Sequence, residues 1–167
     1  MDRLVPSLIV GLVIVGALLG MLLGWRARQR RQADIPQPQA VPSQVGTVLA
    51  AVGALYVATT RRGEPLERIA VRGLGFRSRA VATVSDAGVT LELTGADPVF
   101  IPSGDLRMAG RATWTIDTAV EPGGLVVLSW RFGDLHVDSY LRVDGDSQAF
   151  LDAAAAIATP EAPGGEA

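Results

Sequence analysis

Six arginines gather in a short stretch near the middle of this 167-residue chain, and they are its densest group of residues that could hold a ligand. A guanidinium presents its N–H groups in a planar fork that matches carboxylate and phosphate oxygens. Contact of these side chains with a phosphate or a lipid head group is one of three interpretations of the cluster. The alternatives are a solvated basic surface and nonspecific proximity to anionic lipid. The six are Arg61, Arg62, Arg68, Arg72, Arg77 and Arg79.

The single histidine, His136, lies two residues before Asp138. In an extended strand these two side chains point to one face while Ser139 points to the other, so the three residues cannot converge as a catalytic triad does. One imidazole, no cysteine and scattered carboxylates predict neither a zinc site nor a calcium site. We therefore expect no catalytic residue, no metal and no cofactor, and we do not expect an enzyme.

The stretch Gly73-Leu74-Gly75 is similar to the start of a dinucleotide-binding loop, which needs a third glycine and a following helix. Here Ser78 stands at the third position, and the alternating pattern of a strand follows. The two glycines instead fit a turn between strands, where they supply a positive φ or allow a close backbone approach.

The elements that must hold these residues are mainly β-strands. Turn residues recur about every eight to twelve positions after residue 60, which is typical of an all-β domain. Between the turns apolar and polar residues alternate, which predicts Arg77 and Arg79 on one face of a strand and Phe76 on the other. The segment 45–58 is apolar but too short to span a membrane, so it predicts a buried strand. The five alternating segments are 76–84, 89–93, 111–117, 126–132 and 135–143.

The last element has helical spacing. Asp146 is placed to cap a helix that Pro160 ends. A lone amphipathic helix after a run of strands is expected to cover an open end of the sheet. The sequence therefore predicts a mainly-β domain of about seven strands in a curved sheet or barrel, closed by a C-terminal helix. The apolar face of this helix is expected to hold Phe150, Leu151, Ala154 and Ile157.

The chain begins with an uncharged run of twenty-one residues, from Val5 to Trp25. At about 1.5 Å per residue this run is roughly 31 Å long as a helix, which matches the hydrocarbon core of a bilayer. A cleaved signal peptide would have its positive charges before a shorter apolar segment and a small-residue cleavage site after it. We therefore predict an uncleaved transmembrane helix.

Basic residues follow the apolar run at once. By the positive-inside rule they predict a single-pass protein of the plasma membrane, with its N-terminus outside and its C-terminal domain in the cytoplasm. Glycines recur at every fourth position within the run, and such a ridge favours helix dimers, the alternative being a passive anchor. We expect the membrane interface at Trp25, Arg26, Arg28, Arg30 and Arg31, and the dimer face at Gly16, Gly20 and Gly24.

Composition limits what the rest of the chain can be. After the anchor roughly 110 to 125 residues remain, which suffices for one domain with its own core. The absence of cysteine agrees with a reducing compartment. Residues 34–82 carry six arginines against three acids, whereas residues 83–167 carry four against thirteen. This acidic second half does not favour nucleic acid as a partner.

These features divide the chain into four parts. We expect a transmembrane anchor with its basic flank at 1–31, a semi-extended Pro/Gln linker at 32–44, a folded domain at 45–158 and a disordered tail at 159–167.

Four stretches of the domain carry a family resemblance: Tyr56–Thr60, Leu66–Ala70, Gly73–Ala80 and Val127–Asp134. They resemble the corresponding parts of an actinobacterial family of membrane-anchored pleckstrin-homology-like (PH-like) proteins, which are uncharacterised single-pass membrane proteins. The resemblance extends over nearly the whole chain. It implies one N-terminal transmembrane helix joined to a PH-like domain, and it implies no catalytic residues.

The leading function that the sequence supports is a binding or scaffold module under the membrane, which recruits a protein partner or a second copy of itself. One alternative is a sensor of anionic lipid head groups that uses the arginines. Another is an accessory subunit of a membrane transporter or enzyme, held by the glycine ridge. The expected partners are thus the lipid bilayer and a protein whose identity the sequence does not give.

Overall fold

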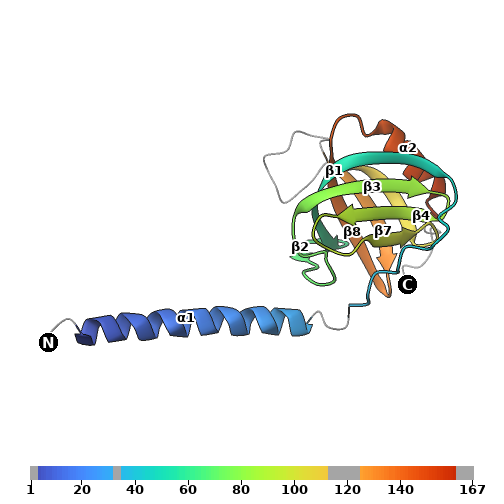
Figure 1. Cartoon of the computed structure of the whole chain (residues 1–167). Helices are drawn as coiled ribbons and strands as arrows, with labels where there is room; N and C mark the ends of the chain where they lie inside the picture. The colour runs from blue at the N-terminus through green and yellow to red at the C-terminus, as the bar shows by residue number, and fades with distance from the viewer. Residues whose placement is uncertain (1–3, 32–34, 113–124, 161–167) are drawn as a thin grey trace. The chain divides into compact units, whose positions relative to one another are not determined.

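The computed structural model describes residues 4–31, 35–112 and 125–160, and Figure 1 shows their elements. The chain divides into two compact units, Met1–Ile35 and Pro36–Ala167. Residues 161–167 of the tail predicted at 159–167 and most of the strand predicted at 111–117 lie outside the described residues. Thr159, the first residue of the predicted tail, is attached to the domain, since its N–H donates to the Leu106 C=O (2.9 Å).

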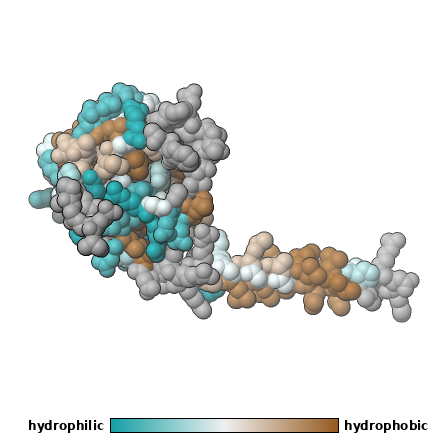
Figure 2. All heavy atoms as spheres, turned by 180° about the vertical axis from the view of Figure 1, so that it is seen from behind, coloured by the Kyte–Doolittle hydropathy of each residue, from teal (hydrophilic) through white to brown (hydrophobic). Residues whose placement is uncertain are grey.

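The first unit contains the helix α1 (Leu4–Arg31). Within it, Pro6–Ala27 is long and apolar enough to cross a membrane, and no part of the most apolar stretch is buried. Figure 2 shows apolar side chains along this helix. N-terminal helices of this kind serve as membrane anchors or as signal sequences.

The second unit is a mainly antiparallel β domain. In its described part the sheet has eight strands and is followed by the helix α2 (Gln148–Ile157). Short turns separate most of the strands, as the turn residues predict. The strands are β1 (Val48–Arg61), β2 (Glu64–Arg68), β3 (Ser78–Ser85), β4 (Gly88–Leu93), β5 (Val99–Pro102), β6 (Leu106–Ala112), β7 (Leu125–Phe132) and β8 (Leu135–Val143).

The sheet curves strongly but does not close (Figure 1). Its strand order is β5-β4-β3-β1-β8-β7-β6, and the short β2 pairs with β1 beside this path. The two outermost strands, β5 and β6, follow one another in the sequence, yet they are not paired with each other over the residues described. The predicted curved sheet with a C-terminal helix is therefore confirmed, in its open form.

Alternating burial along the strands is confirmed where the sheet is covered on one face. In β8, Val137, Ser139 and Leu141 are buried, while His136 and Arg142 are exposed. Both faces of β7 are covered, since its odd and even positions are buried alike. Each large apolar side chain buried in this way contributes about 1.5–3 kcal/mol to folding. Facing pairs in the core of β3 and β4 are Ala80–Leu93, Ala82–Leu91 and Val84–Val89.

Two predicted strands were wrong in their limits. β3 begins at Ser78, so Phe76 is not an inward residue of it, and its side chain is 69% exposed. For the same reason Arg77 lies outside the strand and does not share a strand face with Arg79. β6 begins at Leu106, five residues before the strand predicted at 111–117, and residues 113–117 of that prediction lie outside the described residues.

β1 extends from 48 to 61 rather than from 45 to 58, and only its second half is buried. The first half pairs with β3 alone, because β8 reaches only as far as Ala54 on the other side. Val48 and Leu49 are consequently exposed. The apolar sequence of this segment therefore predicts the strand but not how much of it is covered.

Helix α2 lies across the sheet and packs against β6 and β1, with smaller contacts to β3 and β4. Ser147, and not the predicted Asp146, is its N-cap residue. Asp146 lies one residue before this N-cap. Its carboxylate still accepts a hydrogen bond of 2.9 Å from the N–H of Gln148, the first residue of the helix, whose N–H has no partner within the helix. The buried face holds the predicted Phe150, Leu151 and Ala154, with Ile157 half-buried.

A lead-in segment, residues 36–47, precedes β1. Gln39 forms an isolated antiparallel bridge with Phe100 of β5. Further along, the Thr47 N–H donates to Asp86 Oδ2 (2.8 Å) and the Asp86 N–H donates to the Thr47 C=O (3.1 Å). Much of the stretch expected to be a linker is thus attached to the domain.

Candidate binding site

A four-residue turn in the connection between β2 and β3 carries Arg72. The Leu74 N–H donates to the Val71 C=O (3.1 Å), and φ is 59° at Arg72 and 82° at Gly73. Two successive positive φ angles define a type I′ turn, whose central positions favour glycine, asparagine and aspartate. Among the residues that the structure describes, Arg72 is the only non-glycine residue with a positive φ. The turn therefore holds a long cationic side chain at an unfavourable backbone position.

The core fixes this turn from its C-terminal side. Leu74 is only 2% exposed, and its C=O accepts a hydrogen bond from the Tyr56 hydroxyl (3.0 Å). A Cβ on Gly75 would lie 2.8 Å from the Ala70 carbonyl oxygen, so glycine is needed for the chain to pass this closely. The predicted roles of Gly73 and Gly75 in a turn, positive φ and close approach, are confirmed.

A chain of buried polar side chains lies behind the turn. The Trp130 Nε1–H donates to Ser139 Oγ (2.9 Å), and Ser139 Oγ lies 2.7 Å from Thr59 Oγ1. Thr59 Oγ1 in turn lies 2.8 Å from the Tyr56 hydroxyl oxygen. The Leu74 carbonyl can only accept, so the Tyr56 proton points to it. A single direction along the chain then lets each hydroxyl donate once and accept once.

The Tyr56 hydroxyl at the end of this chain stays protonated over the ordinary pH range. Burial raises the pKa of Tyr56 far above its usual value, and the hydrogen bond with Thr59 and the charge of Arg68 offset this only in part. A protonated hydroxyl is required to donate to the Leu74 carbonyl. The attachment of the turn to the core therefore does not depend on pH near neutrality.

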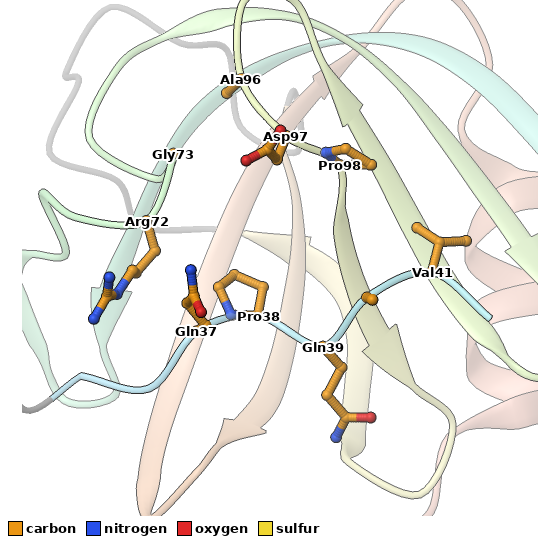
Figure 3. A pocket seen from close by; sticks show the side chains of 10 residues that line it. Gln37, Pro38, Gln39, Val41, Arg72, Gly73, Ala96, Asp97 and Pro98 are labelled. Atoms are coloured by element: carbon orange, nitrogen blue, oxygen red, sulfur yellow. The ribbon is translucent and has the colours of Figure 1, made fainter.

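Three segments of the chain surround a groove of about 810 Å³, which lies within the size range of ligand sites (Figure 3). The first wall is the lead-in segment, held on β5 by the bridge at Gln39. The second is the turn with Arg72 and Gly73, and the third is the loop between β4 and β5. A Cβ on Gly73 would lie 3.3 Å from Ala96 Cβ, so the second and third walls pack closely. The lining residues are Gln37, Pro38, Gln39, Ala40, Val41, Arg72, Gly73, Ala96, Asp97 and Pro98.

The groove carries one cation and one anion, Arg72 and Asp97 (Figure 3). Both side chains are exposed, and neither makes a hydrogen bond or an ion pair with another described residue. Gln37 and Gln39 add two carboxamide groups, each with donors and an acceptor. The lining has no net charge, so it suits a dipolar or polypeptide ligand better than a multiply charged anion.

The six predicted arginines are not brought together at one point. Arg61 and Arg62 lie at the hairpin between β1 and β2, and Arg68 is the last residue of β2. Arg61 Nε lies 3.7 Å from Glu67 Oε2, so an acid of the same hairpin balances part of its charge. These three arginines form a basic hairpin end that is separate from the groove.

Arg79 lies apart from this hairpin end. It is paired with Leu55 on β1, six residues before Arg61, which corresponds to about 20 Å along the strand. Arg79 Nη1 donates to Asp144 Oδ2 at 3.0 Å, and both side chains are well exposed. Of the six predicted arginines, Arg72 is the one that lines the groove.

Two large apolar side chains are exposed in the part of the chain that carries the arginines. Leu66 of β2 is 79% exposed, and Phe76, which precedes β3, is 69% exposed. Arg68 and Arg77 lie near them in the sequence. Apolar and cationic side chains together are typical of surfaces that meet a membrane interface. The sequence prediction missed this surface because it placed Phe76 inside the sheet.

His136 and Asp138 lie on the outer side of β8, and Ser139 points into the core, as predicted. Asp138 Oδ1 accepts a hydrogen bond of 2.6 Å from Ser129 Oγ of β7, which makes it part of the strand pairing. Ser139 is engaged with Trp130 in the buried polar chain. These residues therefore do not converge, and the described residues contain no group of three or more metal-ligating side chains.

The predicted dimer face and membrane interface both lie on α1. A Cβ added to any of the glycines Gly16, Gly20 and Gly24 would meet nothing within 4 Å in the described chain. Trp25 is 55% exposed. The glycine ridge is thus open to a second helix, and its role stays a prediction. The interface arginines on the same helix are Arg26, Arg28, Arg30 and Arg31.

Sequence reasoning missed most of the groove. In the sequence Asp97 is only part of a turn, and Gln37 and Gln39 are only part of a linker. No local pattern marks them, because the groove is assembled from three segments far apart in the chain. Of its charged residues, Arg72 alone could be found from the sequence, through its neighbouring arginines.

A curved antiparallel sheet with a helix lying across it defines a PH-like domain. Comparison with protein-family models gives the same result, since the family described as bacterial PH domain-like matches residues 34–156. The chain therefore belongs to the bacterial PH domain-like family. No curated protein and no solved structure matches the chain. Domains of the PH-like class are in general binding modules rather than enzymes.

Proposed function

We propose that this protein is a membrane-anchored binding module whose PH-like domain recruits a protein partner. The observation that carries the proposal is the groove, because one of its walls is fixed to the core and it is lined by two charges that have no partner among the described residues. Membership of the PH-like class supports binding rather than catalysis. Because the lining has no net charge, a polypeptide suits it better than a phosphate.

The anchor in this proposal is α1, with the domain on the cytoplasmic side of the plasma membrane. The 22 residues Pro6–Ala27 are about 33 Å long as a helix, enough to cross the hydrocarbon core, and arginines follow them. The same proposal assigns the chain to an actinobacterial, membrane-anchored branch of the family. It also divides the chain into an anchor (1–31), a linker (32–44), a PH-like domain (45–158) and a tail (159–167).

Two measurements on the native membrane test the anchor: the mass of the mature protein and its resistance to extraction. We expect the full-length mass, retention in the membrane fraction after carbonate washing, and cleavage of the domain only when protease is added from the cytoplasmic side. A mature protein that lacks residues 1–31 would show that α1 is a signal sequence.

Partner recruitment is tested by crosslinked capture of the full-length protein from native membranes. The wild-type protein is compared with the groove variant Asp97→Lys and with His136→Ala, which changes an exposed residue outside the groove. We expect one set of proteins to be enriched with wild type and His136→Ala and lost with Asp97→Lys. Equal capture by all three proteins would show that the groove is not the binding site.

A second function is favoured by the exposed side chains of Leu66 and Phe76, 79% and 69% exposed. Together with Arg68 and Arg77 they would let this part of the domain rest on anionic lipid, which adds about 1 kcal/mol per arginine near the surface. Hydrogen exchange on the full-length protein in nanodiscs tests this function. Protection of residues 61–77 should appear with anionic lipid, fall with salt and be absent with phosphatidylcholine alone.

A further inference from the structure

We infer that Arg72 is the anchor of a peptide site, in which the groove takes an extended protein segment that places an acidic side chain against this guanidinium. The inference rests on the proposed function and names the chemistry of the partner. Four observations support it: the backbone of Arg72, its lack of an internal partner, the rigid attachment of its turn, and the second charge in the groove.

The backbone of Arg72 shows that this position is not chosen for stability. Asparagine or glycine is favoured at the first central position of a type I′ turn, where φ must be positive, and Arg72 has φ 59°. Residues held at such angles occur preferentially where a binding site needs the side chain in place. An arginine at this position costs folding free energy, and a role in binding would account for it.

Arg72 differs in its contacts from most other arginines of the domain, and it shares its lack of a hydrogen bond or ion pair among the described residues only with Arg142 of β8, which lies outside the groove. Arg61 lies near Glu67, Arg79 bonds to Asp144, and Arg131 bonds to Asp105 at 2.9 Å. Arg72 makes no such contact among the residues described. Its fork of N–H donors is therefore available to a carboxylate of a second molecule.

The turn that carries Arg72 is rigid, which lowers the cost of ordering a bound segment. Its C-terminal end is fixed by the buried Leu74 side chain and by the hydrogen bond from Tyr56. On its other side Gly73 packs against Ala96 of the facing wall. The guanidinium is thus presented from a fixed backbone.

The rest of the lining selects a peptide carboxylate over a phosphate group. Asp97 lies in the same groove and would repel a dianion more strongly than a single carboxylate. The carboxamides of Gln37 and Gln39 can donate to and accept from the backbone of an extended segment. A basic side chain elsewhere on that segment would be attracted to Asp97.

Binding is tested with the full-length protein in phosphatidylcholine nanodiscs. The probes are fluorescein-labelled nine-residue peptide pools that are uncharged except at the central position, which is glutamate, alanine or phosphoserine. Fluorescence anisotropy should show the glutamate pool binding at least tenfold more tightly than the alanine pool, and more tightly than the phosphoserine pool. Arg72→Asn should weaken binding of the glutamate pool at least tenfold, whereas Arg142→Asn, which changes an exposed arginine of β8 outside the groove, should not.

The stability of the same variants separates a binding role from a structural one. Asparagine suits the type I′ turn, so Arg72→Asn should raise the melting temperature by about 3 °C while it removes binding. Arg142→Asn should neither raise the melting temperature nor remove binding. A fall in melting temperature with Arg72→Asn would show that the arginine supports the fold.

The inference is overturned if the alanine and glutamate pools bind equally, if the phosphoserine pool binds best, if no pool binds, or if Arg72→Asn leaves binding unchanged. The capture experiment with Asp97→Lys decides separately on the proposed function. If a partner is captured equally by wild type and Arg72→Asn, the proposal of a binding module stands and only the proposed role of Arg72 is rejected.

Discussion

The basic hairpin end (Arg61, Arg62 and Arg68) and the turn at Arg72 both carry arginine, but they differ in how firmly the core holds the backbone and in the partners of the side chains. The hairpin end is well exposed, and Arg61 has an acid of the same hairpin nearby, since its Nε lies 3.7 Å from Glu67 Oε2. The turn at Arg72 is fixed to the core, has a positive φ at the arginine, and gives that side chain no partner among the described residues.

This difference shows that arginine density alone does not locate a specific site. Exposed ion pairs are worth about 0–1 kcal/mol and leave the side chains mobile, so the hairpin end suits a diffuse surface such as lipid. A rigid turn fixes one guanidinium in place and suits one particular ligand group. The two regions can therefore be distinguished by how strongly the structure of each depends on contacts with the core.

The largest expected difference between the two regions comes from their leucines. Leu74→Ala should lower the free energy of unfolding by about 2–5 kcal/mol, because it empties a buried position under the turn. Leu66→Ala at the hairpin should change it by less than about 0.5 kcal/mol, since that side chain is 79% exposed. Urea unfolding followed by tryptophan fluorescence measures both. Similar losses for the two variants would remove the distinction between the regions.

The next largest effect is expected at the hydrogen bond that holds the turn. Tyr56→Phe leaves the Leu74 carbonyl and one hydroxyl of the buried chain unpaired, which should cost about 1–3 kcal/mol. Hydrogen exchange should speed up at 71–75 more than at 61–64. Tyr140→Phe is the matched control, because Tyr140 is only half-buried and its loss should be smaller. If exchange speeds up at both stretches alike, the turn is not held by this bond.

The same tyrosine predicts how stability depends on alkaline pH. Burial raises the pKa of Tyr56 above its value of about 10 in the unfolded chain, so the unfolded chain loses this proton first. The free energy of unfolding should be unaffected by Tyr56 below about pH 9 and should then fall with rising pH, by about 1.4 kcal/mol per pH unit. Burial also raises the pKa of Tyr140, so part of the fall should remain in Tyr56→Phe. Urea titrations between pH 8 and 11 would measure this, and equal slopes for the two proteins would contradict it.

The smallest effect is expected at the ion pair of the hairpin. Arg61→Ala should change the free energy of unfolding by less than about 0.5 kcal/mol, and the change should decrease further in 0.5 M salt. Glu67→Ala should have the same small effect, and the double variant should show little coupling. A loss above about 1 kcal/mol would mean that the hairpin end is as rigid as the turn.

The sequence predicted the elements that depend on local pattern. The alternation of β8, the helical face of α2 and the turn at Gly73 and Gly75 were all confirmed, because each follows from residues close in the chain. In β7 the predicted inner residues are buried, but their neighbours are buried too, because both faces of this strand are covered. The cap of α2 was wrong by one residue, Ser147 in place of Asp146, which is within the usual uncertainty of helix ends.

Features that depend on distant residues could not be predicted. The exposure of Val48 follows from where β8 ends, and the exposure of Phe76 follows from where the turn returns the chain to the sheet. The positive φ of Arg72 is unexpected for arginine, and no local pattern in the sequence marks it. Asp97 joins Arg72 through tertiary structure alone.

The lead-in segment has one further consequence, because it is both a wall of the groove and the part of the domain nearest to α1 in the chain. Only residues 32–35 separate the helix from this wall, a stretch of at most about 14 Å. Pro36, at the start of this segment, packs on Gly133 of the turn between β7 and β8, since a Cβ on Gly133 would lie 2.8 Å from Pro36 Cγ. A pull on the chain from its N-terminal side would therefore act on this contact and on the groove wall that follows it. A ligand in the groove and a pull on this segment would act on the same wall, so each would change the effect of the other.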